Sequence, residues 1–377
     1  MDGPSHLIDR PSAAVAQGYL HLAQVGLRRM YDANSAGFPQ TARLNSVTEP
    51  PDLRSEGHSV RYTAIAALGI GRLSSSDQQT VLTGSEAADL VAPVTARALA
   101  GNDPGAVALA AWLAAESKAE VDAARGVRRI RELVLSGAAI PTVDQSWLLT
   151  ALVEYGLSDD LQPIAAEIVA RLLRHQHQGG IFPHVLPPDR QSRLRSHIGC
   201  FADQVYPIQA LARYAAATGD NRAMTAANRC AARICELQGP AGQWWWHYDS
   251  RTSQVVEGYP VYSVHQHAMA PMALFDLNQA GGDDHRQAIA KGLAWVASHP
   301  ELSDPLIDSE RGVIWRKIGR REPPKAMRSL RSVSTAIYPG LRLRALDPMF
   351  PPVRIDHECR PYELGWLLYA WTRTGES

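Results

Sequence analysis

Residues 144–152 read Asp-Gln-Ser-Trp-Leu-Leu-Thr-Ala-Leu, and residues 203–211, which lie 59 positions later, read Asp-Gln-Val-Tyr-Pro-Ile-Gln-Ala-Leu. A third stretch at the same spacing, residues 262–270, reads Tyr-Ser-Val-His-Gln-His-Ala-Met-Ala. Each stretch begins an apolar, alanine-rich segment that predicts a helix, and each segment runs into a turn that contains Gly or Asp. The spacing predicts an internal repeat of about 60 residues.

The second half of each repeat carries a signature of its own. Residues 176–182 match Gln-x-x-x-Gly-x-Phe, and residues 238–244, which lie 62 positions later, match Gln-x-x-x-Gly-x-Trp. Weaker copies occur at residues 311–315 and at residues 37–38, the latter followed by an apolar helix over residues 62–68. One repeat is therefore a hairpin of two helices, and the chain of 377 residues holds about six of them.

The apolar pattern of the helices predicts a fold in two layers. Helices that are apolar nearly all round belong inside a second layer of helices, and residues 148–152 and 268–274 have this character. Strand signals are scarce, because alternating runs and hairpin dipeptides are few. We therefore expect an all-α fold, an α/α toroid (barrel) of about six helical hairpins, with residues 1–377 in a single domain. Residues 362–371 would form the last helix and close the ring.

The Gln-x-x-x-Gly-x-Trp pattern resembles the repeat of the terpenoid-cyclase and prenyltransferase toroid superfamily. The resemblance implies the same toroid, with the glutamine tying the end of an outer helix to the following turn, and it bears on the fold more than on the chemistry. The Asp-x-Asp-Asp motif with which class II terpenoid cyclases protonate an alkene does not occur in the sequence, nor does Asp-Asp-x-x-Asp, which binds a magnesium diphosphate. A standard terpenoid cyclase is therefore not expected.

The composition restricts the partners and the compartment. Lys and Arg number 38 and Asp and Glu 38, so the net charge is zero, and neither nucleic acid nor an anionic membrane surface is an expected partner. No apolar run reaches the ~18 residues of a membrane span, and the N-terminal residues lack the pattern of a secretory signal. The four cysteines form no Cys-x-x-Cys pair. We expect a cytoplasmic protein with reduced thiols.

The connection over residues 244–267 is the richest in aromatic and titratable side chains. The repeat assigns Trp244 to packing, because Phe182 holds the same place one unit earlier, whereas residues 245–249 exceed what the repeat requires. In a toroid such connections gather with the inner-helix N-termini around one mouth of a central cavity, and flat aromatic faces suit the C–H faces of sugars or carbocations. The residues predicted to bind a small-molecule or oligosaccharide substrate are Arg61, Tyr206, Trp246, His247, Tyr248 and Tyr262.

The residues predicted to be catalytic are Asp203, Glu257, Tyr259 and His265. Asp203 recurs at the register of Asp144, which leaves two interpretations open. Both carboxylates can be N-caps of their helices, each worth ~1 kcal/mol. Alternatively, Asp203 is a carboxylate at the cavity mouth that acts as an acid, a base or a ligand to sugar hydroxyls.

Residues 246–277 resemble part of the C-terminal α/α domain of D-glucuronyl C5-epimerases, which carries Glu-Tyr-Pro, a helix and a Gly-Leu-Tyr-Asp-Leu end. The resemblance implies that Glu257 and Tyr259 take part in moving the C5 proton of a uronic acid. Removing that proton requires a base and a neighbouring cation that stabilises the enolate-like charge, a role open to Arg251 or Arg61. In this chain a glycine separates the glutamate from the tyrosine.

No metal site and no other cofactor are predicted. The histidine pairs within residues 175–177 and 265–267 are each two positions apart, and on a helix such pairs point to different faces. No cysteine or carboxylate stands at zinc-site spacing beside them, apart from the stretch Asp-His-Glu-Cys at residues 356–359 near the C-terminus.

Residues 311–331 carry many arginines and lysines against a single glutamate. One interpretation is a solvated loop. The other is a lip of guanidinium groups for an anionic substrate, either a uronate or a phosphate.

These features predict a carbohydrate-acting enzyme, an epimerase, lyase or hydrolase that uses acid–base chemistry in an aromatic-lined central cavity. If Asp203 and Glu257 face each other, they form the paired carboxylates of a glycosidase. The first alternative is an isoprenoid-handling toroid, with an apolar cavity and at most one acid at its base. The second is a non-catalytic scaffold that binds a sugar or a lipid. The sequence leaves the oligomeric state open.

Overall fold

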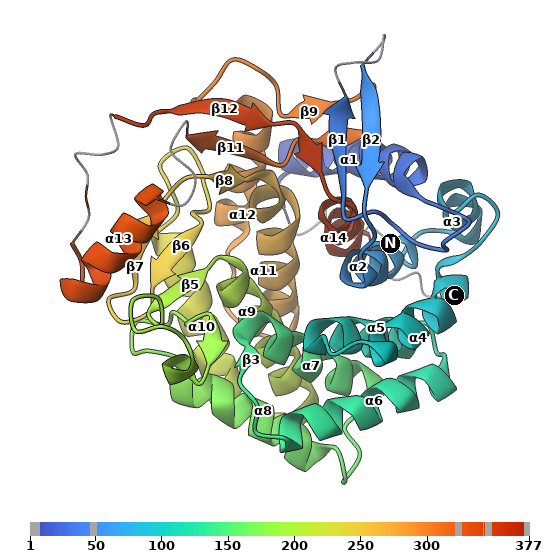
Figure 1. Cartoon of the computed structure of the whole chain (residues 1–377), viewed down its shortest axis with the longest axis horizontal. Coiled ribbons are helices and arrows are strands. Elements are labelled where there is room, and N and C mark those ends of the chain that lie inside the picture. Colours follow the sequence, from blue (N-terminus) through green and yellow to red (C-terminus); the bar gives the residue numbers. More distant parts are fainter. Residues whose placement is uncertain (1–7, 46–50, 321–325, 342, 344–348, 373–377) are drawn as a thin grey trace.

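The structure, a computed structural model that describes residues 8–45, 51–320, 326–341, 343 and 349–372, is built of two concentric rings of helices (Figure 1). The inner ring consists of α2 (Val60–Ile70), α5 (Pro104–Glu116), α7 (Thr142–Tyr155), α9 (Ala202–Thr218), α11 (Ala270–Gln279), which a π-helical turn (His265–Met269) precedes, and α14 (Pro361–Trp371). Each inner helix packs against the next in this order, and α14 packs against α2. The predicted α/α toroid is confirmed, and its last helix closes the ring.

The outer ring covers the inner one. It consists of α1 (Arg10–Met30), α4 (Val91–Ala100), α6 (Glu120–Leu135), α8 (Gln162–His175), α10 (Asn221–Glu236) and α12 (Arg286–Ser298). The side chains explain the two layers, because inner α5 buries every residue from Gly105 to Ala114, whereas outer α10 buries only one stripe of mainly small residues. In the described part of the chain each outer helix precedes an inner helix, which gives the six predicted hairpins.

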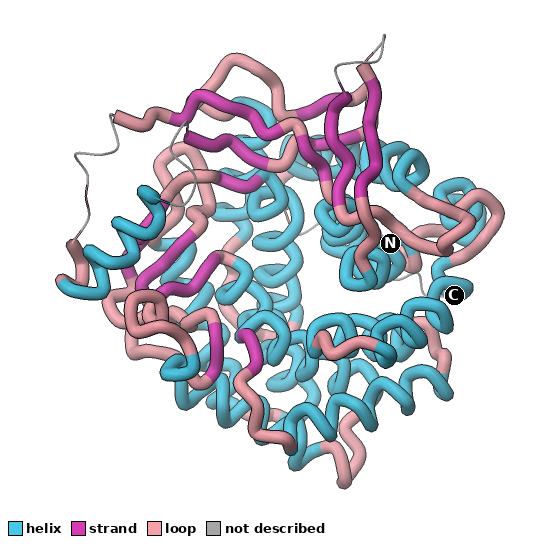
Figure 2. Tube along the Cα trace, viewed as in Figure 1, coloured by secondary structure: helices cyan, strands magenta, loops and turns pink. Residues whose placement is uncertain are grey.

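The connections of the two kinds differ in length (Figure 2). From an inner to an outer helix the chain mostly makes a short turn, as at residues 219–220; the exception, between α2 and α4, contains α3 (Ser75–Val81) and a 3-10 turn (Ala87–Leu90). The described strands all lie in outer-to-inner connections. Since the helices alternate in direction, these connections lie together with the N-termini of the inner helices, at what we name the N-terminal end of the inner ring.

The strands of these connections are short. They are β1 (Thr41–Asn45), β2 (Asp52–Glu56), β3 (Ile140–Pro141), β4 (Val185–Leu186), β5 (Ile198–Cys200), β6 (His247–Asp249), β7 (Gln254–Glu257), β8 (Val261–Tyr262), β9 (Ile307–Asp308), β10 (Val313–Ile314), β11 (Lys317–Arg320), β12 (Pro352–Asp356) and β13 (Glu358–Cys359). The sheet β5–β6–β7 matters most for the site, because it pairs Cys200 with His247 and His247 with Glu257. Strands of two to five residues are too short to show an alternating pattern in the sequence.

The basic stretch over residues 311–331 is not one loop. Its strand β10 pairs with β9, and β11 lies between β8 and β12. After residues 321–325, which lie outside the described residues, the chain continues as α13 (Ala326–Ile337). The prediction of a solvated loop is therefore wrong for residues 313–320, where the backbone is paired.

The Gln-x-x-x-Gly-x-Trp signature ties neighbouring outer helices together. The Nε2 of Gln238 donates to the carbonyl of Gly242 at 2.9 Å and to the carbonyl of Ala288, on α12, at 2.9 Å. Gln176 makes the corresponding two bonds one repeat earlier, to its own turn and to α10. This role of the glutamine was predicted from the resemblance and is confirmed.

A second glutamine ties the turn to the inner helix. Gln204 accepts the N–H of Phe182 at 2.8 Å and donates to its carbonyl at 3.0 Å. Gln266 binds the backbone of Trp244 in the same way, accepting at 3.0 Å and donating at 3.4 Å. The aromatic residue of each turn is thereby held against the core, and the predicted packing role of Trp244 is confirmed by its 0% exposure.

This second glutamine corrects the alignment of the third repeat. It directly follows Asp203 in one copy and His265 in the next, so these two residues occupy the same place. A constant offset of 59 instead pairs Asp203 with Tyr262, three residues too early. The connection is three residues longer in this copy, and the inner helix opens with the π-helical turn His265–Met269.

Helix α1 closes the outer ring. Its 21 residues bury a stripe that includes Leu27 and Met30, and it packs against α12 and α14. Within the described ranges, no helix combines the length and the apolar character that crossing a membrane requires. The assignment of residues 1–377 to a single domain stays a prediction.

Substituting Gly242 tests how the turn holds the outer ring. Gly242 has a φ of 101°, and a Cβ at this position would collide with the carbonyl of Lys291 on α12. Gly281 has a φ of 90° and nothing within 4 Å of the same position, so Gly281→Ala is a matched control. We expect Gly281→Ala to lower the free energy of unfolding by about 1 kcal/mol, and Gly242→Ala by at least about 3 kcal/mol because α12 must move. Urea unfolding measures both, and equal losses would contradict the account.

Candidate functional site

Polar side chains converge on the N-terminal end of the inner ring. Each inner helix contributes one within its first turn, at its cap or in the turn that precedes it; these are Arg61, Asp103, Asp144, Asp203, His265 and Glu363. Asp144, Asp203, His265 and Glu363 are buried, with exposed fractions between 0% and 6%. Buried ionisable groups are costly unless they are paired, and they concentrate at functional sites. We therefore treat this end as the candidate active site.

Asp203 lies at the centre of a small hydrogen-bonded cluster. The Nδ1 of His184 lies 3.1 Å from each carboxylate oxygen of Asp203, and the N–H of Cys200 donates to the same carboxylate at 2.7 Å. The side chain of Asp203 is 0% exposed, whereas that of His184 is 46% exposed and lies at the surface of the cluster. The charge of Asp203 raises the pKa of His184.

The N-cap interpretation of the two aspartates is wrong. Asp144 is the third residue of α7 and Asp203 the second of α9; the caps are Pro141 and Phe201, and neither makes a side-chain cap bond. Asp203 instead reaches back to the N–H of Cys200, which precedes the helix. Neither carboxylate therefore caps its helix. Each is held at the N-terminal end by other hydrogen-bond partners.

Asp144 is held by a shared arginine. Nη1 and Nη2 of Arg61 donate to the two oxygens of Asp144 at 2.7 and 2.9 Å, and Nε donates to Asp103 at 2.7 Å. Burial raises the pKa of Asp144, and the charges of Arg61 and, more weakly, His184 oppose that shift. Helices α7 and α9 pack against each other, so the two aspartates lie in neighbouring clusters on adjacent helices.

Aromatic side chains of the inner helices lie beside these carboxylates. Tyr206 meets Trp147 edge-on at 4.9 Å between ring centroids and lies 6.1 Å from Trp366. The guanidinium of Arg61 stands 5.5 Å from the ring of Trp147. Tyr206 is only 3% exposed, so almost none of its surface is open for the contact with substrate that the sequence predicted.

Trp246 is backed by a chain of contacts that ends at Glu257. The ring of His247 stacks on Trp246 at 3.9 Å, and its Nδ1 lies 3.1 Å from a carboxylate oxygen of Glu257. Trp246 also contacts the ring of Tyr262, with 5.6 Å between the ring centroids. Glu257 is 1% exposed and is linked to the half-buried Trp246 through His247.

His265 packs against the rings of Phe201 and Tyr262. It lies 4.4 Å from Phe201 and 5.2 Å from Tyr262, measured between ring centroids. Burial lowers its pKa to about 3, so the imidazole is neutral at ordinary pH. Its Nδ1 has no hydrogen-bond partner within the described residues.

Two predicted site residues lie elsewhere. The ring of Tyr248 is 1% exposed and belongs to the hydrophobic core. The hydroxyl of Tyr259 donates at 2.6 Å to Glu301, which follows α12, and its ring packs against Trp245. The structure therefore does not bring Tyr248 or Tyr259 to the carboxylates.

A network of charges that the sequence did not predict completes this end. Arg316 lies 3.4 Å from Glu358 and 3.3 Å from Glu363, and its guanidinium stands 5.1 Å from the ring of Tyr262. Burial raises the pKa of Glu363 to about 7, although Arg316 opposes the shift. Lys317 pairs with Asp356 at 2.8 Å. Arg311, Arg316 and Lys317 of the basic stretch are thus paired with acids, and this part of it is not an open lip.

One group of described residues has the donor atoms of a metal site. The ligand atoms of His184, Cys200 and Asp203 all lie within 4.8 Å of one another. The pair His175 and His177 does not belong to it. Two of the three residues lie in the connection before α9 and the third in its first turn. Their spacing in the sequence matches no metal-binding motif, so it did not predict the group.

Position within the repeat is the signal that could have found His184. It follows Phe182 by two residues, and Trp246 follows Trp244 by two residues in the next copy. Both equivalent positions reach the N-terminal end. A comparison of the residues that follow each repeat aromatic would therefore have paired His184 with Trp246.

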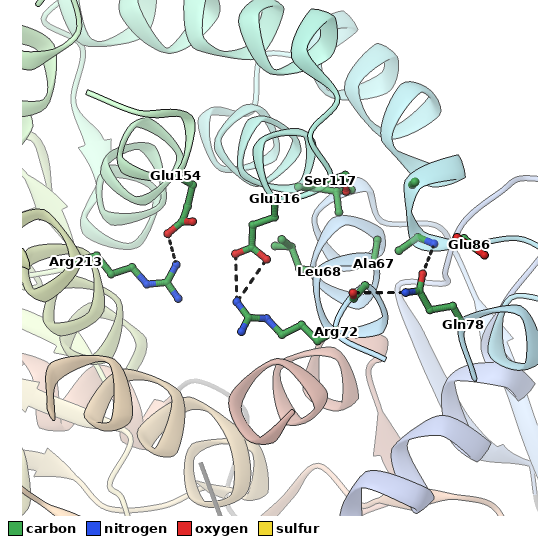
Figure 3. Close-up of a pocket in the computed structure, with 13 residues that line it drawn as sticks. Ala67, Leu68, Arg72, Gln78, Glu86, Glu116, Ser117, Glu154 and Arg213 are labelled. Atoms are coloured by element: carbon green, nitrogen blue, oxygen red, sulfur yellow. Dashed lines mark hydrogen bonds and ion pairs between the residues drawn. The ribbon is translucent and has the colours of Figure 1, made fainter. Parts of the chain in front are cut away.

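The opposite end of the ring holds a cavity of about 480 Å³ (Figure 3). Arg213 donates to Glu154 at 2.8 Å and Arg72 to Glu116 at 3.4 Å, and all four side chains converge in Figure 3. Arginines near helix C-termini offset the negative end of the helix dipoles. Carboxylates are bound by arginines at both ends. The N-terminal end also holds Asp203, which His184 bonds, and the half-buried ring of Trp246, so we place the candidate chemistry there.

Solved structures share this fold over nearly the whole chain. An unsaturated glucuronyl hydrolase specific for heparin aligns with a TM-score of 0.59 and 13% identity, over 95% of this chain and 96% of the other. The unsaturated glucuronyl hydrolase of Bacillus sp. GL1 aligns with a TM-score of 0.55 and 13% identity, over 96% and 97%. A protein described as a possible member of the GH105 family, from Klebsiella pneumoniae, aligns with a TM-score of 0.57 and 10% identity, over 97% and 93%.

These identities establish the α/α toroid and nothing finer. No protein-family model matches the chain, and no curated protein matches it either. The roles of individual residues therefore rest on the geometry of this chain.

Arg61→Ala tests the link between α2, α5 and α7. Asp144 is 2% exposed and would lose its cation, so we expect the free energy of unfolding at pH 7 to fall by about 3 kcal/mol. Burial raises the pKa of Asp144, so the folded variant binds a proton before the unfolded chain does. Its loss of stability should therefore shrink as the pH falls to 5. Urea unfolding at both pH values measures this.

The matched control is Arg129→Ala, which removes an exposed pair with Glu132. We expect it to cost less than about 0.5 kcal/mol at either pH. A loss as small as this for Arg61→Ala, or one independent of pH, would contradict the role of Arg61.

Proposed function

We propose that this protein is a carbohydrate-acting enzyme, a glycoside hydrolase that uses acid–base chemistry at the N-terminal end of the inner ring. The observation that carries the proposal is the pair of buried carboxylates, Asp144 and Asp203, in the first turns of adjacent inner helices. Each has a cationic partner of its own, Arg61 or His184. Hydrolysis of a glycosidic bond typically requires two such carboxylates, one to transfer a proton and one to activate water or stabilise the sugar cation.

The fold supports a saccharide substrate. Toroids that align over at least nine-tenths of both chains include two unsaturated glucuronyl hydrolases. Their names make saccharides that end in an unsaturated glucuronyl residue the first substrates to test. A proposal of this kind rests on fold-level analogy and on the site together.

We assign proton transfer to Asp203 and the second carboxylate role to Asp144. His184 is partly exposed and bonds both oxygens of Asp203, so it orients that carboxylate. Arg61 fixes Asp144 by a two-pronged contact, which sets its direction. Asp203 thus keeps the catalytic role predicted from the sequence, and its partner carboxylate is Asp144 and not Glu257.

The aromatic residues would form the sugar-binding wall. Trp246 and Tyr262 are half-buried and offer ring surface, whereas Tyr206 and His265 are buried and pack against other rings at this end. Glu257 is a positioning residue, because it holds His247 under the ring of Trp246. Flat rings favour the apolar faces of sugars.

Hydrolysis fits the charges better than epimerisation or elimination does. Those reactions need a cation that is free to stabilise an enolate-like intermediate. Among the described residues at this end, Arg61, Arg251, Arg316 and Lys317 are each bonded to carboxylates. The isoprenoid alternative predicted at most one acid at the site, which disagrees with the two buried aspartates.

Asp203→Asn and Asp144→Asn test the assignment. Each replaces a carboxylate with a group of the same shape that cannot take up a proton. We expect kcat/KM on an unsaturated glucuronyl disaccharide to fall by at least about 100-fold in either variant. The loss of the ultraviolet absorbance of the substrate's C4=C5 double bond measures the reaction, and circular dichroism checks the fold.

The matched control is Asp220→Asn, at the opposite end of the same helical hairpin. Asp220 is the N-cap of α10, and asparagine caps a helix equally well. The activity of the Asp220→Asn variant should equal that of the wild type. Full activity of Asp203→Asn would contradict the catalytic role, and saturable binding of saccharides without turnover in the wild type would favour the scaffold alternative.

Trp246→Ala tests the binding wall. We expect KM to rise roughly tenfold with a smaller change in kcat, because stacking contributes to binding in the ground state and the transition state alike. Trp246→Phe, which retains a flat ring, should recover most of the loss. A kcat effect larger than the KM effect, or no recovery with phenylalanine, would count against a stacking role.

A further inference from the structure

We propose that His184, Cys200 and Asp203 form a binding site for a thiophilic divalent cation such as Zn²⁺. Their ligand atoms, an imidazole nitrogen, a thiol sulfur and a carboxylate oxygen, lie within 4.8 Å of one another. The site goes beyond the proposed hydrolase function and depends on the geometry of the three ligands alone.

The separations suit a tetrahedral cation. Zn–N and Zn–O bonds of about 2.0–2.1 Å at tetrahedral angles place the two donors about 3.3 Å apart. Nδ1 of His184 already lies 3.1 Å from each oxygen of Asp203. A Zn–S bond of about 2.3 Å places sulfur about 3.6 Å from the other donors, so the observed limit of 4.8 Å exceeds the requirement by about 1 Å. The ligand side chains must therefore move by up to about 1 Å when the cation binds.

The three ligands are mounted on fixed backbone. The backbone of His184 accepts the N–H of Thr142 at 2.9 Å and donates to Ile198 at 3.2 Å. Cys200 ends β5, which pairs with β6, and its carbonyl accepts Nε2 of Gln204 at 3.0 Å. A site assembled before the metal arrives loses little conformational entropy on binding.

A further hydrogen bond orients one of the ligands. The N–H of Cys200 donates to the carboxylate of Asp203 at 2.7 Å, which fixes that carboxylate as outer hydrogen bonds do in metal sites.

The donor set selects the class of metal. Ca²⁺ and Mg²⁺ are bound by oxygen ligands, which two of these three donors are not. Thiolate and imidazole favour Zn²⁺ and its close substitute Co²⁺. On binding, Nδ1 of His184 gives up the proton that it shares with Asp203 and the S–H bond of Cys200 breaks. Both protons pass to solvent and metal–nitrogen and metal–sulfur bonds form, so the thiolate and the carboxylate together balance the charge of the cation.

The site has an entrance and an open coordination position. The side chain of His184 is 46% exposed, so a hydrated cation can approach from that side and keep a water as its fourth ligand. A cation bound to Asp203 occupies the carboxylate to which we assign proton transfer. Metal binding and that reaction would therefore exclude each other.

A spectroscopic titration with Co²⁺ tests the site without any substrate. The protein, first freed of metals with a chelator and kept reduced with a non-thiol reductant, is titrated with CoCl₂. We expect one equivalent of Co²⁺ to produce a thiolate-to-cobalt charge-transfer band and the visible bands of tetrahedral cobalt, and we expect Zn²⁺ to remove both. Absence of the charge-transfer band in the wild type would overturn the proposal.

Three variants identify the ligands. Cys200→Ser should lose the charge-transfer band, and His184→Ala, whose side chain is exposed enough to leave the fold intact, should bind Co²⁺ at least about tenfold more weakly. Cys235→Ser, at another half-buried thiol, is the matched control and should titrate like the wild type. A band that persists in Cys200→Ser, or unchanged affinity in His184→Ala, would overturn the proposal. Since no saccharide is present, failure here leaves the hydrolase assignment untouched, and the converse also holds.

Discussion

In two successive repeats, two glutamines hold the turn between an outer and an inner helix, and the placement of the site residues depends on them. Gln238 binds the turn to the next outer helix, and Gln266 binds the backbone of Trp244 to the inner helix. Gly242 lets this turn approach α12 so closely that no side chain fits between them. Because buried backbone groups must be satisfied, a repeat that supplies these partners fixes the path of the chain. The residues that follow the turn then emerge at the N-terminal end of the inner ring.

That end is where the fold concentrates polar groups at a cost in stability. Asp144, Asp203 and Glu363 are buried carboxylates, and each lies beside at least one cation supplied by another element. Such pairs add little net stability, because desolvation offsets most of their attraction. Their presence in the first turns of inner helices is therefore better explained by chemistry than by folding, and the aromatic wall around Trp246 agrees with that explanation.

The sequence predicted the toroid and the packing of Trp244 correctly, because both depend on patterns that recur along the chain. The sequence did not predict the positions of side chains that depend on the path of a single outer-to-inner connection. His184 reaches Asp203 through the path of residues 183–203, and the one sign of it in the sequence is its position two residues after the repeat aromatic Phe182. His247 and Tyr248 were both assigned to the site, but they are neighbours on strand β6, and successive strand residues point to opposite faces. His247 therefore backs Trp246, whereas Tyr248 enters the core.

The central claim is that the N-terminal end of the inner ring binds and cleaves a saccharide. The most direct measurement is a crystal structure of the Asp203→Asn variant with an oligosaccharide that the wild type cleaves. The account predicts a sugar ring against Trp246 and Tyr262, with the scissile oxygen within hydrogen-bond distance of residue 203 and near Asp144. A saccharide bound instead in the cavity at the opposite end, against Arg72 and Arg213, would contradict it.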